Sequence, residues 1–289
     1  MTNSDKETQK PKENYLINDD SKNLNPEPQT EDPNYKAAGK LKGKTAIITG
    51  GDSGIGQAVA IAFAKEGADV AIGYLESEDD ANYTKSRIEK IGQKALVFKG
   101  DVGQESYATE VVSKVIEEWG HLDILVNNAG EQHVQEKIGD ITAEQLDRTF
   151  RTNIFSQFYF VKAAMPHLSE GASIINTTSI TAYRGSEHLL DYSATKGAIT
   201  AFTRSLSQNS EVIDKKIRVN GVAPGPIWTP LIPATFTEEQ LEDWGKGGAI
   251  ERAGQAFELA PTYVYLASTD SSYVSGQVLH VNGGVVING

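Results

Sequence analysis

A short apolar run followed at once by a glycine-rich turn is the feature that most limits what this chain can fold into. Residues Thr45–Thr49 fit a buried parallel strand. Gly50, Gly54 and Gly56 come directly after it, and a helical segment covers 57–66. Glycines let the backbone turn tightly beside a phosphate, and the helix N-terminus offers free N–H groups and the positive end of its dipole. The unit predicts a nucleotide-binding turn, although its Gly-x-x-x-Gly-x-Gly spacing differs from the usual dinucleotide fingerprint.

Strands and helices alternate along the rest of the chain. Apolar runs predict six further strands, at 70–74, 95–99, 124–127, 173–177, 217–222 and 278–281. Helices are expected at 79–91, 104–119, 143–165, from Tyr192 to about Ser210, and at 257–267. Repeated strand–helix units imply an α/β fold in which a doubly wound, seven-stranded parallel sheet has helices on both faces. We therefore predict one domain over 41–289, with its ligand site beyond the carboxyl ends of the strands.

One of these helices carries the sequence Asp191-Tyr192-Ser193-Ala194-Thr195-Lys196. Residues four apart share a helix face, so Tyr192 and Lys196 present a phenol and an ammonium side by side. A nearby cation favours the phenolate and lowers its pKa. A tyrosine with such a neighbour can give or take a proton at a carbonyl or alcohol oxygen. The spacing by itself is weak, because such a pair is usually a solvated helix face.

The composition suits an ordinary globular protein and excludes several partners. The 289 residues are 39% hydrophobic and 23% charged, which is enough to bury a substantial core. A net charge of −12 argues against a nucleic-acid partner, because phosphate binding needs a basic face. No apolar run approaches the roughly 18 residues that span a bilayer, and residues 1–40 lack a signal-peptide core, so we expect no membrane partner. The lack of cysteine excludes disulfides and thiolate metal sites; we predict a cytoplasmic protein and assign no metal ligands.

Residues 1–40 differ from the rest of the chain in being polar and rich in proline. Such a stretch cannot bury enough apolar surface to offset its ordering entropy. We predict a flexible arm, in which Tyr15, Leu16, Ile17 and Tyr35 are possible anchors onto a neighbouring subunit. A plain disordered tail is the simpler alternative.

Several short motifs follow one another along the predicted domain. They are Thr49-Gly50-x-x-x-Gly54-x-Gly56, Asp101, Asn127-Asn128-Ala129-Gly130, Asn153, Ser179, Tyr192-x-x-x-Lys196 and Pro224-Gly225. Together, over about residues 41–285, they resemble the single-domain short-chain dehydrogenase/reductase family. The resemblance implies a Rossmann-like fold and an NAD- or NADP-dependent oxidoreductase whose small-molecule substrate is a carbonyl or an alcohol. The pattern also resembles bacterial general-stress-type reductases with a polar N-terminal arm, and glucose 1-dehydrogenase-like and 3-oxoacyl-carrier-protein reductase-like members.

Four catalytic residues are implied by the resemblance. Tyr192 would be the general acid for carbonyl reduction and the base for alcohol oxidation. Ser179, thirteen residues earlier, would bind and orient the reacting oxygen. Lys196 would lower the pKa of Tyr192 and bind the nicotinamide ribose. Asn153 would hold a water that relays protons to Lys196, although a polar residue here can also satisfy backbone at a helix kink.

The resemblance also implies which residues hold the cofactor. Asp101 and Val102 would flank the adenine, while Ile227 and Thr229 would meet the nicotinamide carboxamide. Asn127 is expected to tie strands together rather than touch the ligand. The full expected set is Gly50, Asp52, Ser53, Gly54, Ile55, Gly56, Tyr74, Leu75, Asp101, Val102, Asn128, Ala129, Gly130, Tyr192, Lys196, Pro224, Gly225, Ile227 and Thr229.

The choice between NAD and NADP depends on the end of the second predicted strand of the sheet. An acid there binds the ribose 2′-hydroxyl, whereas an arginine accommodates a 2′-phosphate. This chain has Tyr74 and Leu75 where either would be expected, followed by four acids within 76–80, and no Lys or Arg lies in the glycine turn. Because those acids would repel a phosphate, NAD is favoured over NADP. Acids at the start of a helix are, however, also favourable without any ligand.

Between Trp228 and Ile250 the regular alternation breaks, and apolar side chains mix with threonines, acids and glycines. In the family the corresponding segment is a mobile lid over the substrate, and we expect a lid at about 228–250. A surface helix pair packed on its own core is the alternative. Tyr183 and His188 precede Tyr192 on a predicted loop that could line the pocket, where His188 is expected to be an ordinary loop histidine rather than a second catalytic group.

The last predicted helix and strand resemble the family elements that pair with symmetry mates. An apolar strand at a sheet edge needs covering, so we predict a homotetramer. Two other functions compete with the oxidoreductase. A catalytically silent nucleotide-sensing regulator can share the fold, but such proteins usually lose the tyrosine or the lysine. A sugar-nucleotide epimerase or dehydratase also uses Tyr-x-x-x-Lys, but carries a substantial C-terminal substrate domain that we do not expect here.

Overall fold

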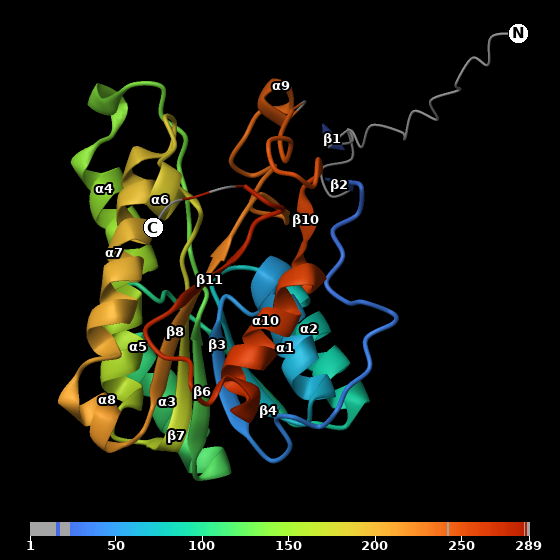
Figure 1. Cartoon of the computed structure of the whole chain (residues 1–289), viewed down its shortest axis with the longest axis vertical. Helices are drawn as coiled ribbons and strands as arrows, with labels where there is room; N and C mark the ends of the chain where they lie inside the picture. The colour runs from blue at the N-terminus through green and yellow to red at the C-terminus, as the bar shows by residue number, and fades with distance from the viewer. Residues whose placement is uncertain (1–15, 18–23, 242, 286, 288–289) are drawn as a thin grey trace, which may run out of the picture.

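The computed structural model describes residues 16–17, 24–241, 243–285 and 287 of the chain. Its main sheet has seven parallel strands in the order β11-β8-β7-β6-β3-β4-β5 (Figure 1). The strands are β3 (Thr45–Thr49), β4 (Asp69–Tyr74), β5 (Ala95–Lys99), β6 (Leu122–Asn127), β7 (Leu168–Thr177), β8 (Arg218–Pro224) and β11 (Val278–Val281). The predicted α/β fold with a seven-stranded parallel sheet is confirmed.

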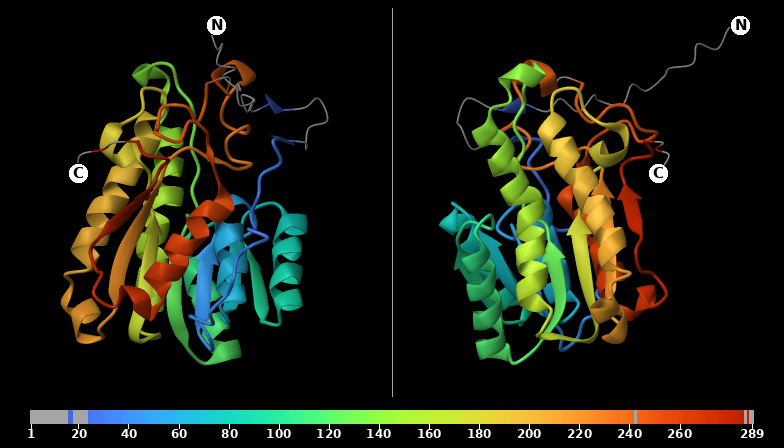
Figure 2. Two further views of the ribbon diagram at one scale, coloured as in Figure 1. Left: turned by 45° about the vertical axis from the view of Figure 1, so that its right-hand side comes forward. Right: turned by 90° about the vertical axis from the view of Figure 1, so that its left-hand side faces the viewer.

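Helices cover both faces of the sheet, as Figures 1 and 2 show. On one face lie α1 (Gly54–Lys65), α2 (Glu78–Ile91) and α10 (Ala256–Ala267); on the other lie α3 (Glu105–Trp119), α5 (Ser156–Ala164) and α7 (Leu190–Leu206). Each face has its own apolar core, and neighbouring strand residues alternate between them: Ile48 belongs to the first core and Ile47 to the second. Burial on both faces explains why the strands are continuous apolar runs in the sequence.

Shorter elements connect this framework and cover its ends. β1 (Leu16–Ile17) pairs antiparallel with β2 (Leu24–Asn25), and β9 (Ile227–Trp228) pairs parallel with β10 (Gly254–Gln255). The short helical elements are α4 (Ala143–Phe150), α6 (Thr181–Arg184), α8 (Ser210–Asp214), α9 (Glu238–Leu241), η1 (Ile138–Asp140) and η3 (Thr269–Ser271). Within the described part of the chain, no helix combines the length and the apolar character needed to cross a membrane.

The helix predicted as one stretch over 143–165 is interrupted in the structure. A π-helical turn, η2 (Arg151–Phe155), separates α4 from α5. Single π turns inside α-helices often occur at functional sites. The interruption places Asn153 in the turn, where its buried side chain contacts elements outside the helix.

Local capping residues explain why most helix ends lie close to their predicted positions. The Ser77 hydroxyl accepts the Asp80 N–H and begins α2, which then ends at Gly92 with a left-handed φ of 105°. A reciprocal capping box between Gln255 and Glu258 begins α10. These signals are local in sequence, so a pattern can predict them.

The described end of the predicted N-terminal arm contacts the domain, and the flexibility of the arm stays a prediction. Glu31 receives two hydrogen bonds from Arg87 of α2, at 2.8 and 3.1 Å. Tyr35 donates to the buried carboxylate of Glu66 at 2.6 Å, so this predicted anchor contacts its own chain. Another of the expected anchors, Tyr15, lies outside the described residues.

Candidate active site

A cavity of about 700 Å³ opens at the carboxyl ends of the strands, where a parallel sheet is expected to bind its ligand. Most of the predicted site residues line it. They are Gly50, Asp52, Ser53, Gly54, Ile55, Tyr74, Leu75, Asp101, Val102, Asn128, Ala129, Gly130, Ser179, Tyr192, Lys196, Pro224, Gly225, Ile227 and Thr229. Gly56 and Asn153 do not line the cavity but lie behind its wall.

The glycine turn after β3 forms one end of the cavity. A Cβ on Gly56 would lie 1.9 Å from the carbonyl oxygen of Gly50, so no larger residue fits this turn without moving the backbone. Asn128 fixes the turn from the other side by donating to the Gly50 carbonyl at 3.1 Å. Helix α1 begins at Gly54, and Ser53 makes no side-chain cap hydrogen bond to its first N–H groups. Uncapped N–H groups at a helix N-terminus next to a tight glycine turn fit a dinucleotide pyrophosphate.

The strand ends behind the cavity are joined by side-chain amides. Asn127 of β6 donates to Asn176 of β7 at 2.9 Å, and Asn176 donates in turn to Thr203 of α7 at 2.9 Å. The predicted role of Asn127 in tying strands together is therefore confirmed.

An arginine that the sequence analysis did not identify binds Asp101 in the wall of the cavity. Arg148 of α4 donates to the Asp101 carboxylate and, at 3.0 Å, to Glu131. Asp101 also accepts the Gly103 N–H at 2.8 Å. The carboxylate expected to flank the adenine is thus held in place by charge-assisted hydrogen bonds. No local motif could reveal this contact, because Arg148 and Asp101 are 47 positions apart.

Acidic side chains gather where β4 ends. Asp52, Glu76 and Asp80 all line the cavity there, beside Tyr74 and Leu75. Burial raises the pKa of Asp52, and the charge of Asp80 adds a smaller effect in the same direction. This part of the cavity therefore carries a negative potential.

Two hydroxyl groups meet at the other end of the cavity. Ser179 follows β7, and its Oγ accepts from the Thr181 N–H at 3.1 Å and from the Thr181 hydroxyl at 3.0 Å. With both of its lone pairs engaged, Ser179 keeps its own O–H as a donor. Tyr192 comes from the first turn of α7 and lines the same cavity as Ser179. The pair can hold one oxygen atom of a ligand between a donor and a proton-transfer group.

The ammonium of Lys196 lies below Tyr192 on the same helix. Its Nζ is 5.3 Å from the centroid of the Tyr192 ring and donates to the Thr177 carbonyl at 2.9 Å. Burial lowers the pKa of Lys196 to about 8 and raises that of Tyr192 to about 12, against a smaller lowering by the Ser179 hydrogen bond. The expected lowering of the Tyr192 pKa is therefore not found in this structure. The lysine faces the ring and a carbonyl rather than the phenol oxygen, so desolvation dominates.

Asn153 is fully buried and its amide is engaged on both sides. Its Oδ1 accepts the Glu131 N–H at 2.8 Å, and its Nδ2 donates to the Glu131 carbonyl at 2.9 Å and to Thr195 at 3.1 Å. It thus satisfies backbone beside a helix irregularity, which was the structural alternative for this residue. It also lies close to Lys196, because a Cβ on Gly130 would be 3.4 Å from Asn153 Oδ1 and 3.5 Å from Lys196 Nζ.

A buried carboxylate missed by the sequence analysis positions the start of α7. Asp191 accepts from Gln145 at 3.0 Å, from the Thr149 hydroxyl at 2.8 Å and from the Tyr192 N–H at 2.9 Å. It therefore links α4 to the turn that carries Tyr192. Its place in the first turn of a helix next to Tyr192 is the signal that could have identified it.

Comparisons with known proteins agree with this geometry. A family model described as enoyl-(acyl carrier protein) reductase matches residues 50–286. A short-chain dehydrogenase from Burkholderia cenocepacia, solved in complex with NADP, superposes with a TM-score of 0.79 at 32% identity, covering 85% of this chain and 99% of that one. The chain belongs to the short-chain dehydrogenase/reductase family. It is similar to general stress protein 39 of Bacillus subtilis, with 58% identity over 90% of this chain and 91% of that protein.

A plant relative extends the similarity. The chloroplastic NADPH-dependent aldehyde reductase 1 of Arabidopsis thaliana is 49% identical over 90% of this chain and 92% of its own length. The family model and these similar proteins show that this short-chain dehydrogenase/reductase is an NAD(P)-dependent oxidoreductase.

The predicted lid of this short-chain dehydrogenase/reductase both lines the cavity and has a core of its own. Trp228, Ile232, Leu241 and Ala253 form a small buried cluster, against which Phe236 and Trp244 pack. The rings of Trp228 and Trp244 are 5.9 Å apart. From the same segment, the residues facing the cavity are Thr229, Pro230, Leu231, Ile232, Phe236 and Trp244. Its substrate side is thus largely apolar, and its mobility stays a prediction.

The segment between Ser179 and Tyr192 differs from the expected loop. Residues Thr181–Arg184 form the short helix α6, and Tyr183 lines a second cavity instead of this one. His188 does not line the catalytic cavity either, and its Nδ1 lies 3.5 Å from Glu136. The residues of this segment that do line the catalytic cavity are Ile180, Thr181, Arg184, Ser186 and Leu189.

Proposed function

We propose that this short-chain dehydrogenase/reductase interconverts a carbonyl group, of an aldehyde or ketone, and an alcohol, with Tyr192 as general acid and base. The observation that carries the proposal is that the hydroxyl-bearing side chains of Tyr192 and Ser179 line one cavity, together with Lys196. A carbonyl oxygen placed between them would accept a hydrogen bond from Ser179 and a proton from Tyr192. The alcohol would return its proton to Tyr192 in the reverse direction.

The hydride itself would be supplied by a bound nicotinamide cofactor. The glycine turn, Asn128 and the uncapped start of α1 would hold its pyrophosphate, and the walls at Asp101, Val102, Ile227 and Thr229 its two ends. Lys196 would bind the nicotinamide ribose hydroxyls. Its ammonium would also stabilise the Tyr192 phenolate when that forms, because the two groups share one helix face.

Asn153 would support a proton relay to Lys196 only through a water held beyond its present partners. Both ends of its amide already bind Glu131 backbone, and Nδ2 also binds Thr195. Its proximity to Lys196 across Gly130 supports the relay. We therefore propose Asn153 as a positioning residue that keeps the Glu131 backbone and α7 in register, with the water relay as its further role.

Two observations bear on the cofactor in opposite directions. Three similar proteins have names or titles that mention NADP or NADPH, and they do not support the NAD preference expected from the sequence. The acids Asp52, Glu76 and Asp80 line the cavity beyond β4, where a ribose 2′-phosphate would need a cation. The cations that line the cavity, Arg148, Arg184 and Lys196, come from other walls. We propose NAD(P) as cofactor, with the acids favouring NAD.

Parallel fluorescence titrations with NADH and NADPH test the cofactor choice. Tighter binding of NADH means that the acids act as proposed, whereas tighter binding of NADPH would contradict the NAD preference. Binding of neither would overturn the enzymatic proposal.

Turnover of simple aldehydes by a Tyr192→Phe variant tests the catalytic role. We expect kcat to fall by at least about 10³-fold while cofactor affinity stays within about threefold, because the ring remains and the proton donor is lost. Tyr273→Phe, at a fully exposed tyrosine, is the matched control. Unchanged turnover in Tyr192→Phe would refute the assigned role. Cofactor binding by wild type without turnover of any carbonyl or alcohol would favour the nucleotide-sensing regulator instead.

The state of assembly and the location are further parts of the proposal. β11 lies at the edge of the sheet and pairs with β8 on one side. An edge strand of this kind needs covering, which supports the homotetramer. Sedimentation that shows only monomer at micromolar concentration would remove it. A cytoplasmic location is likewise proposed, and cell fractionation would test it.

A further inference from the structure

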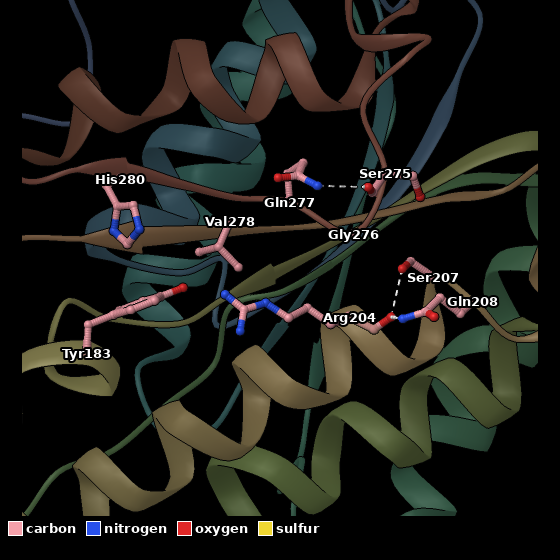
Figure 3. Close-up of a pocket in the computed structure, with 9 residues that line it drawn as sticks. All are labelled: Tyr183, Arg204, Ser207, Gln208, Ser275, Gly276, Gln277, Val278 and His280. Atoms are coloured by element: carbon pink, nitrogen blue, oxygen red, sulfur yellow. Dashed lines mark hydrogen bonds between the residues drawn. The ribbon is translucent and has the colours of Figure 1, made fainter. Parts of the chain in front are cut away.

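A second cavity, of about 470 Å³, lies between α6, the end of α7 and the segment that leads into β11 (Figure 3). It shares no lining residue with the catalytic cavity among the described residues. Its lining is mostly polar, in contrast to the apolar lid. The residues are Tyr183, Arg204, Ser207, Gln208, Ser275, Gly276, Gln277, Val278 and His280.

The guanidinium of Arg204 and the hydroxyl of Tyr183 point toward one another within this cavity (Figure 3). The Tyr183 hydroxyl is buried and has no hydrogen-bond partner among the described residues. A buried hydroxyl without a partner costs free energy, so its presence beside a cavity indicates a ligand or an ordered water. His280 packs edge-on against the Tyr183 ring, with the centroids 4.6 Å apart. Three donor-bearing side chains therefore converge from α6, α7 and β11.

The charges around the cavity favour an anion. No Asp or Glu belongs to its lining, and no ion pair of Arg204 is found in the part of the chain that the structure describes. Arg204 is exposed, so water solvates its guanidinium and an anion can reach it. The planar fork of arginine fits phosphate and carboxylate oxygens better than other cationic side chains do.

The end of α7 could oppose an anion, because the last carbonyls of a helix carry partial negative charge. Here the Arg204 carbonyl is already occupied: it accepts from Ser207 Oγ at 2.8 Å and from Gln208 Nε2 at 3.0 Å. Gly276 closes the same end of the cavity. Its φ is +74°, and a Cβ there would lie 2.8 Å from Ser207 Oγ, so this close approach requires glycine.

We propose that Arg204, Tyr183 and His280 form a binding site for an oxyanion, a phosphate or a carboxylate group, separate from the catalytic cavity. Arg204 would bind two of its oxygens, and the Tyr183 hydroxyl would donate to one. The imidazole of His280 is exposed, and partial desolvation lowers its pKa, so its neutral form would donate through its one N–H. The volume of the cavity leaves room for the rest of a small metabolite that carries such a group.

Calorimetric titration of the full chain with inorganic phosphate, and in a second arm with malonate, tests the site. The protein is first saturated with whichever reduced cofactor it binds more tightly, so that the glycine turn is filled. Arg204→Gln should weaken anion binding by at least about tenfold, and Tyr183→Phe by about threefold. Lys90→Gln removes an equal charge at an exposed position of α2 and should leave the affinity unchanged.

The arms separate the two kinds of oxyanion. Binding of phosphate that depends on Arg204 supports a phosphate ligand, and binding of malonate alone supports a carboxylate. Equal affinities in Arg204→Gln and Lys90→Gln would overturn the site. Absence of anion binding in wild type would also overturn it. A changed sedimentation coefficient in Arg204→Gln would then show that a second copy covers the cavity. None of these outcomes depends on the role of Tyr192.

Discussion

The Lys196 ammonium lies 5.3 Å from the centroid of the Tyr192 ring and donates to the Thr177 carbonyl. The lysine therefore faces the ring of the tyrosine and not its phenol oxygen. Lys196 is buried and Tyr192 is partly buried, and desolvation disfavours the charged form of each. The pKa of Lys196 is consequently lowered to about 8, and that of Tyr192 is raised to about 12. The two shifts have the same cause and opposite signs.

Cofactor affinity should therefore depend on pH near 8. Lys196 is protonated below its pKa of about 8 and neutral above it. Because a charged ammonium binds ribose hydroxyls and attracts a pyrophosphate more strongly than a neutral amine, we expect affinity for the reduced cofactor to fall by up to about tenfold between pH 7 and pH 9. Fluorescence titrations across this range measure it. Lys196→Arg keeps its charge and should give a flat profile, and a flat profile in wild type would contradict the expectation.

Replacing Gly56 with alanine should damage the cofactor site directly. The new Cβ would lie 1.9 Å from the Gly50 carbonyl oxygen, so the turn must open and its N–H groups must move. We expect at least tenfold weaker binding of the reduced cofactor, which corresponds to a loss of about 1.4 kcal/mol in binding free energy. Gly139→Ala, which meets nothing within 4 Å, is the matched control. Equal affinities for the two variants would show that the turn does not hold the cofactor.

Asp191→Ala should reduce both stability and turnover. Three donors, from Gln145, Thr149 and the Tyr192 N–H, would lose their acceptor inside the protein. We expect a loss of about 2–3 kcal/mol in the free energy of unfolding and about tenfold in kcat, because the first turn of α7 also carries Tyr192. Urea unfolding and steady-state kinetics measure the two effects. The exposed Asp214, changed to alanine, should alter neither; a stable, fully active Asp191→Ala would mean that the contacts are dispensable.

Local patterns predict much of the fold, and the family resemblance adds the candidate site residues. The strand at 45–49 and the pair Tyr192 and Lys196 depend on runs and spacings within a few residues, and the structure has them as expected. Ser179 was assigned from the family resemblance, and it lines the same cavity as Tyr192.

The features that were missed depend on contacts between distant parts of the chain. The ion pair of Arg148 with Asp101 joins residues 47 positions apart, and no pattern in either neighbourhood indicates it. The π turn at 151–155 occurs where Asn153 binds the backbone of a loop 22 positions earlier. The pKa of Tyr192 was expected to fall because spacing reveals a nearby lysine but not the depth of burial.

The docked end of the N-terminal arm gives a last prediction, at Glu66. Its carboxylate accepts from the Tyr35 hydroxyl at 2.6 Å and from the Lys40 N–H at 2.8 Å. Burial would raise the pKa of Glu66, but these hydrogen bonds outweigh it and the pKa is lowered. A carboxylate with a lowered pKa stabilises the fold above its ordinary pKa and loses that contribution as pH falls through the folded value. Glu66→Gln should therefore remove much of the arm's attachment at neutral pH and lower Tm by several degrees, about 1–2 kcal/mol. Trypsin should then cut faster after Lys36 and Lys40, while the exposed Glu117→Gln behaves like wild type. Equal cleavage rates in the two variants would show that Glu66 does not hold the arm.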